Sequence, residues 1–130
     1  MCGRKYNLPT LDWQTYRDLF TLDVSAPPSN FSPNYNIAPT HDVPVVAMKD
    51  GKQVLQTMRW GLLPFWAKDK KIGYRMINAR AETVEEKRSF SPSLKSRRCI
   101  IPVSGFYEWK RESKTDKQAY AMRRVDQEPL

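Results

Sequence analysis

The stretch VPVVAMKDGKQVLQTMRW, residues 43–60, predicts the central element of the fold. Its two apolar runs read as strands, and the polar tetrapeptide KDGK joins them. The Asp50-Gly51 pair is a strong hairpin signal, because a tight turn between two strands needs residues that tolerate positive φ angles. We therefore expect an antiparallel hairpin in the middle of the chain.

Strands and short helices are expected on both sides of this hairpin. Apolar residues at helical spacing predict an amphipathic helix over 11–20, and the proline-rich stretch 26–40 predicts an ordered loop. Thr83, followed by Glu86 three residues later, has the pattern of a capping box and predicts a helix that begins there. The mixture indicates an α+β fold with a mostly antiparallel, barrel-like sheet and a few short helices. Further strands are expected at 74–77, 99–103, 106–110 and 119–124, and an irregular aromatic and basic segment at 61–73.

Length and composition bound the class of protein. With 130 residues, a single domain over 1–130 is expected. The 22 basic and 14 acidic residues leave a net charge of +8, which suits a polyanion such as nucleic acid, although a basic protein without such a partner is the alternative. Two cysteines and one histidine are too few for a disulfide framework or a four-ligand zinc site. We expect a reduced, cytoplasmic protein without metal, cofactor or membrane span.

The first candidate for chemistry is Cys2, in the opening MCGR. If Met1 is removed, Cys2 carries a free α-amine and a thiol on adjacent carbons. An aldehyde forms an imine with such an amine, and the thiol then closes a five-membered thiazolidine ring. The alternative is an inert terminal cysteine.

Three polar residues are further candidates. Strand alternation in FYEWK places Phe106 and Glu108 on one face, where a buried carboxylate suits general acid/base work; a Glu paired with an arginine is the alternative. Asn78 can donate to a sugar or carbonyl oxygen, and Arg80 can clamp a phosphate. Their structural alternatives are a turn for Asn78 and an ion pair with Glu82 for Arg80.

Aromatic and basic residues alternate from 60 to 75 in a way that suits single-stranded nucleic acid, with bases stacked on rings and phosphates on cations. An ordinary hydrophobic core explains the rings equally well. We interpret His41 as structural or solvated and Cys99 as a buried strand residue. The aromatic and basic residues are Trp60, Phe65, Trp66, Lys68, Lys70, Lys71 and Arg75.

Five motifs occur together in the order of one known family. The chain resembles the SOS-response-associated peptidase (SRAP) family, whose members process abasic sites in single-stranded DNA. The order of the motifs makes the resemblance specific, and together they span nearly the whole chain. They are MCGR (1–4), YNIAPT (35–40), RWGLLPFWAKD (59–69), MINARAET (76–83) and RRCIIPVSGFYEWK (97–110).

The resemblance implies roles for individual residues. Met1 is removed, and Cys2 captures the ring-opened aldehyde of an abasic site as a thiazolidine. Glu108 moves the proton and Asn78 holds the opened deoxyribose, without metal or cofactor. The implied partner is single-stranded DNA with abasic sites, so the protein is nucleoid-associated when bound. The residues implied to line the DNA groove are Arg4, Asn36, Pro39, Trp66 and Arg80.

The chain departs from the family in one respect. Members continue well beyond this length and carry a later histidine motif similar to HDRMP, which is absent here and which His41 does not match. We expect a chain that lacks the family's C-terminal part and has an open sheet edge. Two other functions stay open: a non-catalytic module that binds single-stranded nucleic acid, and an amide hydrolase or peptidase that uses the N-terminal nucleophile.

Overall fold

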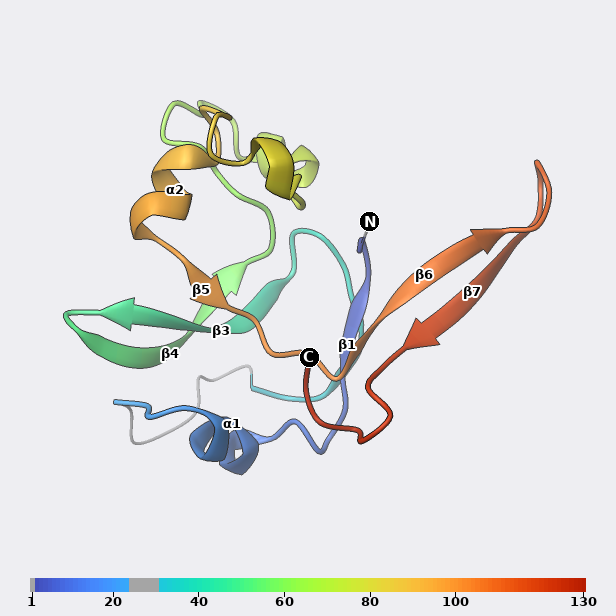
Figure 1. The fold of residues 1–130 in the computed structure, drawn as a ribbon, viewed down its shortest axis with the longest axis horizontal. Coiled ribbons are helices and arrows are strands. Elements are labelled where there is room, and N and C mark those ends of the chain that lie inside the picture. Colours follow the sequence, from blue (N-terminus) through green and yellow to red (C-terminus); the bar gives the residue numbers. More distant parts are fainter. Residues whose placement is uncertain (1, 24–30) are drawn as a thin grey trace.

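The computed structural model describes residues 2–23 and 31–130. Two antiparallel sheets form the frame of the fold (Figure 1). The first has the order β2-β1-β6-β7 and the second the order β4-β3-β5. The strands are β1 (Lys5–Asn7), β2 (Asn34–Ile37), β3 (Asp42–Lys49), β4 (Lys52–Arg59), β5 (Cys99–Ile100), β6 (Gly105–Arg111) and β7 (Lys117–Met122).

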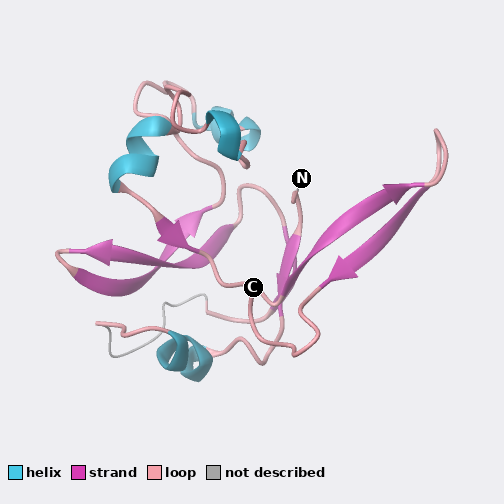
Figure 2. Cartoon of the chain, in the orientation of Figure 1, coloured by secondary structure: helices cyan, strands magenta, loops and turns pink. Residues whose placement is uncertain are grey.

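Helices are few and short (Figure 2). The described chain has two α-helices, α1 (Trp13–Leu19) and α2 (Ser91–Ser96). It also has two 3₁₀ helices, η1 (Lys70–Arg75) and η2 (Ala81–Thr83). The expected α+β class with a mostly antiparallel sheet is therefore confirmed. The sheets do not close into a barrel within the described ranges, and the β6–β7 hairpin projects from the rest of the molecule (Figure 1).

The predicted central hairpin is confirmed. β3 pairs with β4 from Asp42↔Arg59 to Lys49↔Lys52. The turn residues Asp50 and Gly51 have φ angles of 50° and 78°, the left-handed conformations that two-residue hairpin turns favour.

β3 is buried on both of its faces, and each face supports a separate core cluster. Val46 packs on one side with Leu11, Tyr16 and Leu55, whereas Val45 packs on the other side with the second cluster. An apolar run without alternation fits a strand covered on both faces. Strand β3 therefore lies between the two core clusters and contributes to both of them.

Helix α1 supplies much of the first cluster, and the helix expected at 11–20 is confirmed in a shorter form. The Asp12 side chain accepts a hydrogen bond from the Thr15 backbone N–H at 2.9 Å and caps the helix. Tyr16 is completely buried, and its hydroxyl donates to the Pro102 carbonyl at 3.5 Å. Burial raises the pKa of Tyr16 well above its ordinary value.

Two elements were not expected from the sequence. The predicted loop 26–40 contains strand β2, which pairs with β1; residues 24–30 lie outside the described residues. Strand β1 itself carries little apolar pattern, since its sequence is only KYN. Pairing with distant segments, rather than local preference, makes both of them strands.

The prediction of a strand at 74–77 is wrong. Tyr74 and Arg75 end the 3₁₀ helix η1, which Asp69 caps by accepting from the Lys71 N–H at 2.9 Å. The carbonyl of Met76 accepts from the Leu62 N–H at 3.0 Å. The backbone of this segment is thus engaged by a local cap and by the neighbouring loop.

The helix expected from Thr83 is also wrong. Thr83 ends η2, and the following residues form turns in which the Glu86 and Lys87 N–H groups donate to the Thr83 carbonyl. A helix begins only at Ser91, with Pro92 in its first turn. Proline lacks an N–H and is tolerated best in the first turn of a helix, so Pro92 favours a helix that starts at Ser91 over one that continues from Thr83.

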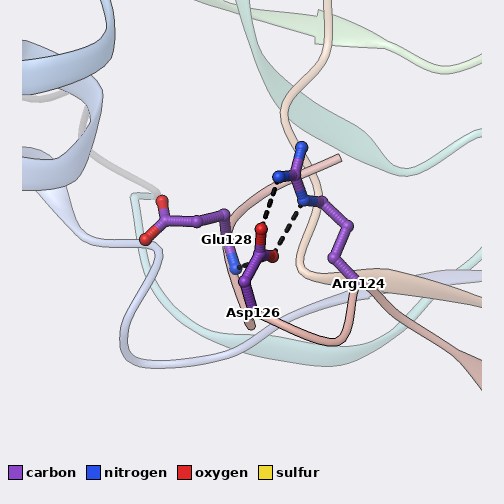
Figure 3. A network of polar contacts seen from close by, with 3 residues as sticks. All are labelled: Arg124, Asp126 and Glu128. Carbon is purple, nitrogen blue, oxygen red and sulfur yellow. Dashed lines mark hydrogen bonds and ion pairs between the residues drawn. The ribbon is translucent and has the colours of Figure 1, made fainter.

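The chain ends in a turn beside the start of β6. Arg124 donates to both carboxylate oxygens of Asp126, which also accepts from the Glu128 N–H (Figure 3). The hydrogen bond from the Arg124 side chain is the main reason that the pKa of Asp126 falls to about 2. Leu130 and Val103 then exchange backbone hydrogen bonds, at 2.9 and 3.3 Å.

The strand expected at 99–103 is shorter than predicted, since β5 is only Cys99–Ile100. The strands expected at 106–110 and 119–124 are present as β6 and β7. All residues of β7 are exposed, and β7 ends the order of its sheet. The described sheet therefore has an open edge on this side.

Candidate functional site

Cys2 lies just before β1, against the second core cluster. Its side chain is half-buried and packs on the cluster formed by Ile37, Val43, Val45 and Trp60. The thiol donates to the Arg4 carbonyl over 3.7 Å, a weak sulfur hydrogen bond. Met1 lies outside the described residues, so its predicted removal stays a prediction.

Asn78, which lies far from Cys2 in the sequence, forms a hydrogen bond with it. The Asn78 side-chain amide donates to the Cys2 carbonyl at 2.8 Å. Asn78 follows Ile77, whose carbonyl accepts from the Trp60 indole N–H at 3.1 Å. A buried ring therefore holds the segment that carries Asn78 against the N-terminus.

A second set of contacts joins Arg4, Asn36 and β6. The Arg4 guanidinium donates to the Asn36 side-chain oxygen at 2.6 Å, and the Arg4 carbonyl accepts from the Tyr107 N–H at 2.9 Å. Glu108 is the next residue of β6 and is half-buried. Glu108 is therefore partly rather than fully covered, and its suggested acid/base role stays a prediction.

Trp60 is a buried residue that contacts several segments of the site, and it does not offer a surface for stacked bases. It is 9% exposed, and its backbone carbonyl accepts from the Thr40 N–H at 2.8 Å. Pro39 precedes Thr40 and is half-buried. Trp60 thus positions both the loop with Pro39 and the segment with Asn78, which is a structural role that the sequence reading left open as ordinary core.

Arg80 lies near Asn78 in the structure. The two residues share the wall of a shallow pocket with Lys87 and Phe90. Both Asn78 and Arg80 are exposed. A pocket with an amide and two cationic side chains can receive a phosphate next to a group held by Asn78.

The two exposed aromatic residues of the 61–73 segment stand apart from this network. Phe65 is 67% exposed and Trp66 39% exposed. The Arg88 guanidinium lies 5.8 Å from the centre of the Phe65 ring. This ring–cation surface suits bases and phosphates of a single strand, whereas no contact given by the described structure joins Trp66 to Cys2.

Lys5 is a site residue that the sequence reading missed. It is only 7% exposed, and its Nζ lies 4.3 Å from the centre of the Trp60 ring. Burial lowers the pKa of Lys5, while the thiols of Cys2 and Cys99 act in the opposite direction. The only available signal was its position, three residues after Cys2, in a strand that the sequence does not reveal.

Cys99 differs from its expected environment, whereas His41 agrees with the expected one. Cys99 is exposed, so the expectation of a buried cysteine is wrong: β5 pairs only with β3, and its other edge is uncovered by the described chain. Partial burial of its thiol nevertheless raises the pKa of Cys99, and Lys5 opposes this rise. His41 is exposed, and its Nδ1 accepts from the Ala38 N–H at 3.4 Å, which fits a structural or solvated histidine.

Two negative findings apply to the described ranges 2–23 and 31–130. No group of three or more His, Cys, Asp or Glu side chains there is arranged to hold a metal ion. No helix in these ranges has the length and apolar character needed to cross a membrane.

The sequence matches a known protein family and individual curated proteins. The family model described as SOS response associated peptidase (SRAP) matches residues 1–130. The abasic site processing protein YoaM of Bacillus subtilis is 47% identical over 116 residues, which are 88% of this chain and 50% of that protein. The abasic site processing protein HMCES of Pongo abelii is 34% identical over 137 residues, with coverage of 91% of this chain and 39% of that protein. The resemblance read from the five motifs is thereby confirmed.

Solved structures share the fold. A protein from Bordetella bronchiseptica superimposes with a TM-score of 0.75 at 22% identity, over 99% of this chain and 60% of that one. A phage-related protein from the same organism gives a TM-score of 0.71 at 26% identity, over 99% and 57%. The chain spans about half the length of the curated relatives that it matches.

Proposed function

Because this chain belongs to the SOS response associated peptidase family, we propose that it processes abasic sites in single-stranded DNA by covalent capture on Cys2. The relatives at 47% and 34% identity carry the name abasic site processing protein. The covalent step, the preference for a single strand and the roles of individual residues are part of the proposal.

The reaction follows from the chemistry of an N-terminal cysteine. Once Met1 is removed, the α-amine of Cys2 attacks the aldehyde of the ring-opened abasic sugar and loses water to give an imine. The thiol sulfur then adds to the imine carbon, and the imine nitrogen gains the proton that the thiol releases. The product is a thiazolidine with one new C–N bond and one new C–S bond, and the only molecule released is water.

The observation that carries the proposal is the hydrogen bond from Asn78 to the Cys2 carbonyl at 2.8 Å. It ties the N-terminus to the segment that also carries Arg80, in one pocket wall. An aldehyde on a bound DNA strand then reaches Cys2 close to the Asn78 amide and the Arg80 guanidinium. Asn78 orients the N-terminus, and Arg80 binds a flanking phosphate.

Glu108 is proposed as the proton shuttle. It follows Tyr107, whose N–H is bonded to the Arg4 carbonyl, so its carboxylate is carried by the strand next to the N-terminal segment. A half-buried carboxylate can protonate the carbinolamine hydroxyl that leaves as water. Arg4, Asn36, Pro39 and Trp66 are proposed to contact the DNA strand around the captured sugar.

Intact mass spectrometry tests the proposal. The purified chain is mixed with a single-stranded oligonucleotide that carries one abasic site. We expect loss of Met1, then a one-to-one adduct whose mass is the sum of both partners minus one water. Cys2→Ala should abolish the adduct, and Cys99→Ala, which removes the other cysteine, should leave it intact.

Three results would contradict the capture function. A stable adduct that survives in Cys2→Ala would show that the Cys2 thiol is not needed, so that the link is not a thiazolidine. Salt-sensitive binding without any adduct would make the chain a nucleic-acid binding module. Turnover of an amide substrate, inhibited by the abasic strand, would make it an N-terminal-nucleophile hydrolase.

A further inference from the structure

Tyr107 of β6 forms hydrogen bonds with two other segments of the chain. Its backbone N–H donates to the Arg4 carbonyl at 2.9 Å, and its side-chain hydroxyl donates to the Tyr35 carbonyl of β2 at 3.0 Å. Strand β1 lies between β2 and β6 in the sheet, so the Tyr107 side chain reaches past β1. One residue therefore links β6 to both the N-terminal segment and β2.

The ring of Tyr107 is supported by the ring of Tyr6 on β1. The two ring centres are 5.0 Å apart, and the ring planes are tilted by 47°. Tyr6 is only 5% exposed, and such aromatic pairs stabilise a defined arrangement of both rings. A buried partner ring limits the directions that the Tyr107 hydroxyl can take, which favours its bond to the Tyr35 carbonyl.

The two residues that Tyr107 binds adjoin or belong to a polar pair that is proposed to contact DNA. The Arg4 guanidinium donates to the Asn36 side-chain oxygen at 2.6 Å, and Asn36 directly follows Tyr35. The buried Nε of Arg4 has no hydrogen-bond partner in the described ranges, so the bond to Asn36 is an important restraint on the guanidinium. A guanidinium has five N–H donors, and those left on the two Nη atoms can bind a phosphate oxygen.

We propose that Tyr107 is a positioning residue that sets the affinity for single-stranded DNA by holding the Arg4–Asn36 pair in place. It holds Arg4 through the backbone and Asn36 through the carbonyl of the preceding residue. The inference rests on the proposed function, in which Arg4 and Asn36 contact the strand, but it assigns Tyr107 a role of its own. Because Tyr107 acts through this pair, its hydroxyl should affect binding and leave the covalent step unchanged.

Tyr107→Phe tests the hydroxyl, because it keeps the ring that packs on Tyr6. Fluorescence anisotropy with an intact single-stranded oligonucleotide should show binding about fivefold weaker, the usual effect of losing one neutral hydrogen bond. Single-turnover adduct formation on an abasic strand should need correspondingly more DNA to reach its half-maximal rate, whereas the rate at saturating DNA should not change. Urea unfolding shows that each variant is folded under the assay conditions.

A double-mutant cycle tests whether the hydroxyl acts through Asn36. Asn36→Ala should weaken binding to the intact strand by itself. Adding Tyr107→Phe to Asn36→Ala should cause little further loss, because residues that act as a unit have non-additive effects. A hydroxyl that only stabilised the sheet would weaken binding by the same factor in both backgrounds.

Tyr120→Phe is the matched control for loss of a tyrosine hydroxyl. Tyr120 is 45% exposed and lies on β7, which β6 and β1 separate from β2. This variant should bind the intact strand as tightly as the unmodified chain. A loss equal to that of Tyr107→Phe would make the effect one of tyrosine hydroxyls in general and would overturn the positioning role.

The outcomes separate this inference from the capture function. If Tyr107→Phe binds the intact strand normally, if its loss simply adds to that of Asn36→Ala, or if the rate at saturating DNA falls, the positioning role is wrong. If binding weakens without additivity but the unmodified chain forms no adduct, Tyr107 does position the pair and the capture function fails. Weaker binding together with a full rate at saturating DNA supports both.

Discussion

The Asn78 side chain donates to the Cys2 carbonyl at 2.8 Å across 76 residues of sequence. This bond joins the start of the chain to the segment between the two 3₁₀ helices η1 and η2. Because the Trp60 indole holds the neighbouring Ile77 carbonyl, the position of the nucleophile depends on a buried aromatic ring two contacts away. The proposed capture site is thus built by contacts between segments that lie far apart in the sequence.

Replacement of Asn78 by Asp tests this bond. The carboxylate keeps the shape of the side chain but cannot donate, and it repels the carbonyl that it faces. We expect capture of an abasic strand to slow about tenfold or more, which corresponds to the loss of a hydrogen bond of roughly 1.4 kcal/mol. Single-turnover adduct formation followed on denaturing gels gives the rate.

Asn34→Asp is the matched control for the added charge. Asn34 accepts from the Asn36 N–H, a bond that a carboxylate also forms. An equal loss in the two variants would point to charge repulsion of DNA, and Asn78 would lose its positioning role.

Glu108→Gln should slow adduct formation while binding to an intact strand stays nearly unchanged. The amide retains the size of the carboxylate but does not carry a proton to and from the reacting oxygen. A decrease of about a hundredfold is typical of the loss of a general acid or base. Adduct rates and fluorescence anisotropy with intact DNA are measured in parallel, and unchanged adduct kinetics would remove Glu108 from the mechanism.

Arg80→Gln should weaken binding to single-stranded DNA and lessen its dependence on salt. Each phosphate contact that is lost reduces the slope of log K against log salt concentration by about 0.7 for a single strand. Trp66→Ala should weaken binding without a change in this slope, because stacking releases no counterion. Anisotropy titrations at several salt concentrations separate the two, and a shared slope change would refute the division of roles.

Gly105→Ala should destabilise the fold by about 2 kcal/mol, the scale of overpacking in a filled site. A Cβ at Gly105 would lie 2.4 Å from the Met122 carbonyl oxygen and 2.4 Å from the Tyr6 hydroxyl. The strand β6 would have to move away from β1 or β7. Urea unfolding measures the change, and Gly3→Ala, where a Cβ meets nothing within 4 Å, should be close to neutral.

Lys5 makes the stability of the fold depend on pH. Its folded pKa lies below the ordinary value of 10.5, so the unfolded chain binds more protons in the interval between the two values. The buried charge of Lys5 lowers the free energy of unfolding most at pH values below the folded pKa. The free energy of unfolding then rises as the pH increases toward 10.5. Lys5→Met should therefore be more stable at pH 7 by on the order of 1 kcal/mol.

Unfolding at pH 7 and pH 9.5 compares the two proteins. The difference between them should shrink at the higher pH. The raised pKa of Tyr16 acts oppositely, because stability is lost above its ordinary value of 10.0, and the comparison with the variant cancels this contribution. A constant difference across the interval would show that Lys5 is not titrating there.

Several parts of the fold could be predicted from local sequence. Helix α1 is encoded by apolar spacing with Asp12 as its cap, and the β3–β4 hairpin by two apolar runs around Asp50-Gly51. The family and the identity of Cys2 as the nucleophile candidate follow from ordered motifs in the printed sequence. Each of these signals is contained in a short run of consecutive residues, which is why it can be read without coordinates.

The tertiary structure decided what depends on distant partners. β1 and β2 are strands because they pair with each other and with β6, not because of their composition. The half-burial of Glu108 and the exposure of Cys99 depend on which sheet edges are covered. Only folding places Asn78 against Cys2 and Lys5 over the Trp60 ring, because hydrogen bonds and packing between remote segments leave no periodic trace in the sequence.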